Sequence, residues 1–82
     1  MAVSFWKMRF RVRLYNPLRL ADLVDALTRA ECSVRELGPV ELEVDVPRAP
    51  SADQAERELK VYLALWDAQN PEARAELLPA ES

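Results

Sequence analysis

Two rows of charged residues in this chain have a spacing that could support binding chemistry. The first, called here the basic row, consists of Arg9, Arg11 and Arg13. The second, the acidic row, consists of Glu41, Glu43 and Asp45. Side chains two residues apart point to the same face of a strand, so each row would present three like charges together. The basic row could contact a phosphate backbone, and the acidic row could bind a hard cation.

Cys32 is the only cysteine of the chain, and there is no histidine. A zinc, haem or iron–sulfur site therefore has too few ligands, and a disulfide framework within the chain is impossible. Arginines opposite the acidic row would compete for the carboxylates that a metal needs. We expect no metal and no cofactor, and we interpret Cys32 as a small buried hydrophobic residue.

Arg19 is a candidate for an anion site, because helix N-termini attract anions and a helix is predicted to begin nearby. The preceding segment, residues 14–18, has no glycine that would build an anion-binding loop. No nucleophile or general base accompanies the arginine. We therefore predict that the protein is not an enzyme and has no catalytic residues.

The composition places these residues in one small folded domain. The chain has 82 residues, 50% of them hydrophobic, which suits a single core and excludes a disordered tail. We expect one domain over residues 1–82, with a core of about residues 3–78 and short flexible ends. No apolar run approaches the ~20 residues of a membrane span, and Met1–Trp6 lacks the features of a secretory signal. A soluble, cytoplasmic protein with no membrane partner is the expectation, which the single cysteine fits.

The beginning of the chain predicts a strand followed by a helix. Residues 3–15 alternate, with apolar residues at even positions, as in a strand whose even face is buried. Asn16 and Pro17 are an N-cap and a first helical residue, and they open a helix of about residues 17–30. Its apolar stripe consists of Leu20, Leu23, Val24 and Leu27.

Two more strands and a second helix follow. Residues 32–37 and 40–46 predict strands separated by a Gly-Pro turn, with Cys32 and Val34 inward on the first. Ser51 and Gln54 form a capping box that opens a helix, which ends before Asn70-Pro71. The inward stripe of this helix consists of Ala52, Ala55, Leu59, Tyr62, Leu63 and Trp66.

Residues 73–78 are compatible with two structures. Alternation of one set of residues with another predicts a short strand: Ala73, Ala75 and Leu77 with Arg74, Glu76 and Leu78. Good helix formers in the same segment favour helical continuation instead. We favour the strand, because Pro71 interrupts the helix and an open sheet edge needs cover.

This order predicts an α+β fold, the ferredoxin-like βαββαβ two-layer plait, with an antiparallel sheet ordered 4-1-3-2 and both helices on one face. The apolar faces of strands and helices must meet in one core. We predict a core of Trp6, Met8, Phe10, Val12, Leu14, Leu23, Leu27, Val34, Leu42, Val44, Leu59, Tyr62 and Trp66.

In that topology, the basic row lies beside the acidic row on the uncovered face of the sheet. Cross-strand ion pairs would then set the strand register, and the acids would cancel the field that a phosphate backbone requires. RNA-recognition domains of this topology stack bases on aromatic residues of the central strands, which carry charged residues here. Tyr15 is the one outward aromatic, near the strand end. We expect no nucleic-acid partner.

The predicted order also resembles that of amino-acid-binding regulatory domains of the ACT type. Such a resemblance implies a small-molecule-sensing regulatory domain. The turn that often carries a glycine in those domains is Asn16-Pro17 in this chain. The resemblance rests on topology and patterning over most of the chain.

The second helix has more apolar surface than its core stripe needs. At 100° per residue, four residues fall away from that stripe: Val61, Ala64, Leu65 and Ala68. Three of them form a possible partner surface: Val61, Leu65 and Ala68. Coverage of Val61 or Leu65 by the first helix is the alternative. Val3, Phe5 and Trp6 also make the first strand longer than its predicted neighbour. We expect an interaction or assembly module that forms a homodimer or binds a protein partner.

Overall fold

The computed structural model describes residues 9–79 of the chain. The elements in chain order are β1 (Arg9–Leu14), the 3-10 turn η1 (Pro17–Arg19), α1 (Leu20–Arg29), β2 (Ser33–Glu36), β3 (Glu41–Asp45), α2 (Ala52–Gln69) and β4 (Ala75–Leu77). This α+β order confirms the predicted elements, with a strand rather than a helix in the C-terminal segment. The parts of the first strand predicted before residue 9 lie outside the described residues.

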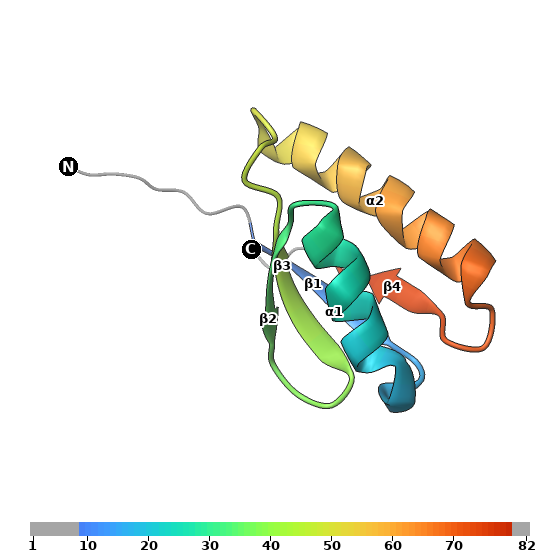
Figure 1. Cartoon of the computed structure of the whole chain (residues 1–82). Helices are drawn as coiled ribbons and strands as arrows, with labels where there is room; N and C mark the ends of the chain where they lie inside the picture. Colours follow the sequence, from blue (N-terminus) through green and yellow to red (C-terminus); the bar gives the residue numbers. More distant parts are fainter. Residues whose placement is uncertain (1–8, 80–82) are drawn as a thin grey trace.

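The four strands form one antiparallel sheet, ordered β2-β3-β1-β4. This is the predicted order, read from the opposite edge. Residues of both helices and of all the strands except β2 share a single buried cluster. Both helices therefore cover the same face of the sheet and leave the other face open (Figure 1).

The alternation in β1 sorts its side chains between the two faces. Val12 and Leu14 are buried under the helices, whereas Arg9, Arg11 and Arg13 are exposed. On β3, Leu42 and Val44 are buried in the same way. A shift of one residue would exchange the two sets, so burial of the even positions specifies the register of the central pair.

Side-chain caps begin both helical segments where the sequence predicts them. The Asn16 side chain accepts a hydrogen bond from the Leu18 amide at 3.1 Å, and Pro17 follows as the first helical residue. Ser51 Oγ accepts from the Gln54 amide at 3.2 Å. The Gln54 side chain donates to Glu58 at 2.9 Å, so it is used along the helix and not for the returning half of the capping box.

The predicted core is largely confirmed, with four kinds of difference. Trp6 and Met8 lie outside the described residues. Ala52, predicted inward, is exposed because it is the end residue of α2, whose buried residues start only at Ala55. Three predicted members are only partly buried against the core: Phe10, Val34 and Tyr62. The buried cluster also includes residues outside the predicted core set: Leu20, Cys32, Val46, Ala49, Ala55, Leu63, Ala73 and Ala75.

The short strand β4 is fixed by side chains of α2 as well as by pairing with β1. The Trp66 indole Nε1 donates to the Ala73 carbonyl at 2.6 Å, just before the strand. The Asp67 carboxylate accepts from the Ala75 amide at 2.9 Å. β4 has only three residues, so pairing with β1 does not satisfy all of the nearby backbone groups. The two side chains bond the Ala73 carbonyl and the Ala75 amide instead.

Among residues 9–79, no helix has the length and apolar character needed to cross a membrane. The expected cytoplasmic location stays a prediction.

Leu59 is the residue that tests this core most directly, because it is fully buried in the middle of α2. We expect Leu59→Ala to lower the free energy of unfolding by about 2–5 kcal/mol in chemical denaturation, from lost burial and the cavity left behind. Leu18→Ala is the matched control, since Leu18 is 88% exposed and should cost almost nothing. Equal effects of the two substitutions would contradict the packing described.

Candidate functional site

The open face of the sheet brings the basic and acidic rows together as predicted. The Cα partners in the two central strands are Arg9 with Asp45, Arg11 with Glu43, and Arg13 with Glu41. The ion pairs themselves run diagonally, with Arg9 Nη1 3.8 Å from a Glu43 oxygen and Arg11 Nη1 4.0 Å from a Glu41 oxygen. These separations exceed hydrogen-bond lengths, so the pairs act as screened charges across a half-exposed surface.

Arg35 of β2 adds a second source of positive charge to this face, which was not predicted from the sequence. Its Cα partner is Glu43, and its Nη1 lies 3.8 Å from a Glu43 oxygen. Glu43 thus stands between two arginines, and its side chain is only 21% exposed. The signal was present in the sequence, because an inward Val34 requires an outward Arg35.

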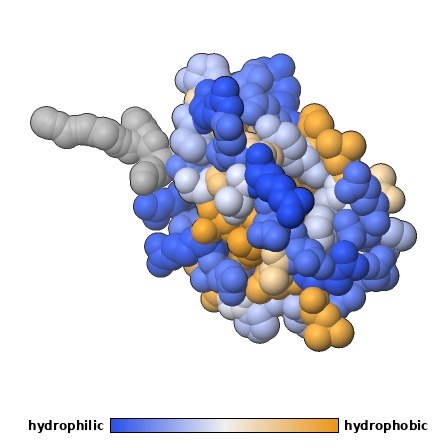
Figure 2. Space-filling model, viewed as in Figure 1, coloured by the Kyte–Doolittle hydropathy of each residue, from blue (hydrophilic) through white to orange (hydrophobic). Residues whose placement is uncertain are grey.

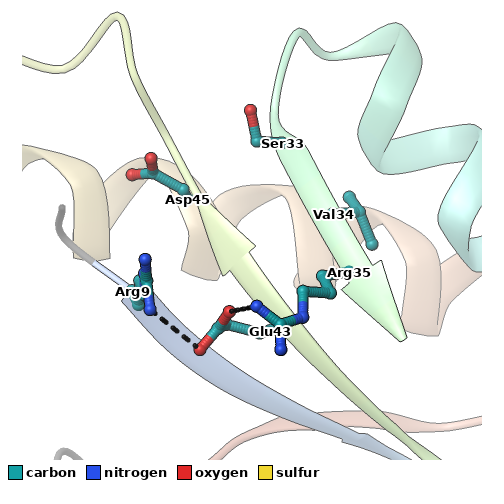
Figure 3. A pocket seen from close by; sticks show the side chains of 6 residues that line it. All are labelled: Arg9, Ser33, Val34, Arg35, Glu43 and Asp45. Atoms are coloured by element: carbon teal, nitrogen blue, oxygen red, sulfur yellow. Dashed lines mark ion pairs between the residues drawn. The ribbon is translucent and has the colours of Figure 1, made fainter. Parts of the chain in front are cut away.

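A hollow of about 190 Å³ lies on this face, between the ends of β1, β2 and β3. Figure 3 shows Asp45 and Ser33 toward one end of it and Glu43, between Arg9 and Arg35, toward the other. Two arginines and two carboxylates give its walls no net charge. The hollow therefore does not concentrate the charge that either a phosphate group or a metal ion needs. Among residues 9–79, no group of three or more potential metal ligands is present.

Tyr15 lies beside this face and is 55% exposed. Its hydroxyl donates to the Glu76 carboxylate of the neighbouring β4 segment, and this hydrogen bond is the main cause that raises the pKa of Tyr15. Its position outside the core agrees with the expectation of an outward aromatic. The hydrogen bond joins it to the edge strand rather than leaving it as a base-stacking platform.

Arg19 does not form the anion site that its position suggested. Its Nε lies 2.7 Å from an Asp22 oxygen, its Nη2 donates to the Asn70 side chain at 2.6 Å, and its Nη1 bonds Glu72. The guanidinium also lies over the Trp66 ring, 5.8 Å from the centroid. All three guanidinium nitrogens have protein partners, so Arg19 joins the turn before α1 to the turn after α2.

Cys32 is buried, as expected, with 6% of its surface exposed. Burial is the main cause that raises the pKa of its thiol, and nearby Glu58 and Asp45 raise it further. A reactive cysteine needs the opposite setting, with positive charge that favours the thiolate. The structure therefore supports a packing role for Cys32.

The surface of α2 is the other feature that the sequence singled out. Val61 and Leu65 are each 56% exposed, and Ala68 is exposed beside them. The alternative in which α1 covers Val61 or Leu65 is therefore wrong. We call these residues, together with the exposed Ala64, the α2 surface.

A groove of about 340 Å³ separates α1 and α2 and continues the α2 surface toward α1. Its floor and walls include Leu23, Ala26 and Leu27 from α1, and Tyr62, Leu65 and Trp66 from α2. Figure 2 shows apolar side chains that interrupt the hydrophilic surface in this view of the molecule. Leu65 belongs to both the α2 surface and the groove, so the two form one partly apolar region.

The diagonal pair between Arg11 and Glu41 offers a test of the charged face. Arg11→Glu should lower the free energy of unfolding by about 0.2–1 kcal/mol, because it removes this pair and places like charges opposite each other. Adding Glu41→Arg should recover part of the loss, as measured by a double-mutant cycle in low salt. Strictly additive effects would show that the two side chains do not interact.

Burial of Cys32 predicts slow alkylation. With iodoacetamide at about pH 8, the folded chain should react at least about tenfold more slowly than the chain in denaturant, because the thiol is both covered and held protonated. Mass spectrometry at timed intervals gives both rates. Equal rates in the two states would overturn the assignment of Cys32 to the core.

No protein-family model matches the chain, and no curated protein or solved structure is significantly similar to it.

Proposed function

We propose that the chain is a ferredoxin-like plait that acts as a non-catalytic protein-interaction module. The observation that carries this proposal is the exposure of Val61 and Leu65, at 56% each, on a helix whose opposite face is fully used in the core. Apolar residues gathered on one side of a folded domain and continued by a groove are typical of a protein contact site.

The arrangement of these residues suits a helical or helix-lined partner. Val61, Leu65 and Ala68 recur at intervals of four and three residues, which places them along one side of α2. Leu65 also borders the groove toward α1, so a partner would contact a ridge and an adjoining depression together. Charged residues at the margins, such as Lys60 and Arg29, supply a polar rim.

The non-catalytic part of the proposal is supported by the state of the best chemical candidates. The guanidinium of Arg19 has partners on all its nitrogens, and the Cys32 thiol is buried with a raised pKa. Each row on the sheet faces charges of the opposite sign. Arg19 and Cys32 are thus engaged in the fold, and the two charged rows are arranged to neutralise each other.

A small-molecule-sensing regulatory domain of ACT-like topology is the second candidate. The observation that favours it is the hollow on the open sheet face, since ligand sites need a concave surface with a few polar groups. A thermal-shift screen of amino acids, nucleotides and metabolites tests it. A ligand at about 100 times its Kd stabilises the folded state by about 2.7 kcal/mol.

The interaction proposal is tested by a photo-crosslinking residue, p-benzoylphenylalanine, placed at position 65 in cells that make the protein. We expect a discrete protein adduct after irradiation, visible as a band of raised mass. The same residue at position 18 is the control, because Leu18 is also an exposed leucine, at 88%, but lies on the 3-10 turn before α1.

An absence of protein adducts at position 65, with a stable folded variant, would overturn the proposed function. Equal adducts at positions 65 and 18 would do the same, because they would reflect random collisions. Introducing Val61→Glu beside the crosslinker should reduce the adduct, since a carboxylate in an apolar contact must lose its hydration.

A further inference from the structure

We infer that the partner of the α2 surface is a second copy of this chain, with the two α2 helices packed antiparallel across a two-fold axis. This inference rests on the proposed function and adds the identity and orientation of the partner. Its support is that the shapes and charges along α2 complement those of a second α2 that runs in the opposite direction.

The shapes along α2 fit a reversed copy. At 100° per residue, Val61, Ala64, Leu65 and Ala68 gather on the side away from the buried Leu59, Leu63 and Trp66. An axis that crosses the helix between Leu63 and Ala64 places Val61 over the depression among Ala64, Leu65 and Ala68 of the second copy. The Val61 side chain then packs beside the two small alanines and against Leu65, as a knob fits a hole between helices.

The polar residues flanking this stripe fit the same axis. Lys60 comes level with Asp67 of the second copy on one flank, and Glu58 comes level with Gln69 on the other. One Asp67 oxygen accepts from the Ala75 amide and one Glu58 oxygen accepts from Gln54, so the second oxygen of each carboxylate meets the second copy. The two-fold axis repeats each contact, which gives two ion pairs and two amide–carboxylate contacts at the rim. Lys60 is exposed and bonds only Glu56, at 3.1 Å within its own helix, among the described residues, so its ammonium can add a further acceptor.

A parallel arrangement of the same helices is unfavourable. The exposed Arg57 lies one turn before Val61 on the same line of α2. Parallel packing would bring Arg57 level with Arg57 of the second copy, and the two like charges would repel at the end of the apolar contact. Antiparallel packing about the same axis instead separates the two copies of Arg57 by about 20 Å along the helix. The position of this arginine therefore selects the antiparallel orientation.

The apolar strip is short, which predicts a weak dimer. α2 has 18 residues, equivalent to about 27 Å of helix, and only its C-terminal half carries the apolar stripe. A contact of this size lies at the lower end of specific interfaces. We expect association that depends on concentration between about 10 µM and about 1 mM.

The first experiment measures the oligomeric state of the purified full chain by sedimentation and light scattering over that concentration range. We expect the mass to rise toward that of a dimer. Val61→Glu with Leu65→Glu should weaken association by about tenfold or more, while Leu18→Glu should leave it unchanged. Circular dichroism and thermal melting confirm that each variant keeps its fold.

The second experiment tests the orientation by disulfide trapping of single-cysteine additions, since Cys32 is buried and does not compete. Ala64→Cys lies next to the axis and should form a disulfide-linked dimer under mild oxidation. Asp53→Cys lies on the same flank near the start of α2, so reversal separates the two copies of that residue by about 30 Å. Asp53→Cys should therefore stay monomeric in non-reducing denaturing electrophoresis.

Each outcome separates this inference from the proposed function. A chain that is monomeric at about 1 mM, with an adduct of a different protein at position 65, would overturn the second copy but keep the interaction module. A dimer unaffected by Val61→Glu with Leu65→Glu would place the interface elsewhere and overturn the inference. Efficient crosslinking through Asp53→Cys would show parallel helices and would also overturn it.

Discussion

The antiparallel pairing of β1 with β3 in the middle of the sheet is the constraint from which the rest of the molecule follows. Burial of Val12 against the same core as Leu42 and Val44 fixes that pairing in a single register. The same register then puts every arginine of β1 on the open face beside carboxylates of β3. One strand pair thus decides both where the helices pack and where the charges neutralise each other.

The spacing of apolar residues, together with the capping and turn residues, was enough to predict the helices and strands and their order. The alternation around Val12, the cap at Asn16 and the cap at Ser51 are local signals, and each is present in the structure. Burial at the ends of elements was harder to predict. Helical spacing gives the direction in which Ala52 points, but it does not show how far along α2 the contact with the core extends. Ala52 was therefore predicted inward, and it is exposed in the structure.

The contacts of Arg19 with Asn70 and Glu72 could not be predicted from the sequence, because they join residues about fifty positions apart. They depend on how two turns meet after both helices have packed, which no local pattern encodes. By contrast, the residues of the α2 surface could be named from the sequence, since helical spacing shows which residues exceed the core stripe, and only coverage by α1 was left open. Local surfaces on regular elements are therefore easier to find than side-chain networks between turns.

The hydrogen bond from the Ala75 amide to Asp67 has a consequence for how the sheet can grow. Edge strands invite further strands by offering free amide groups, and they are the usual route to fibrous aggregates. On β4 a carboxylate from the molecule's own helix already occupies one of these amides and brings a negative charge to the edge. Addition of strands is thus discouraged on this side of the sheet. Among residues 9–79, β2 is the other edge strand, and an open-ended stack needs both edges to be receptive.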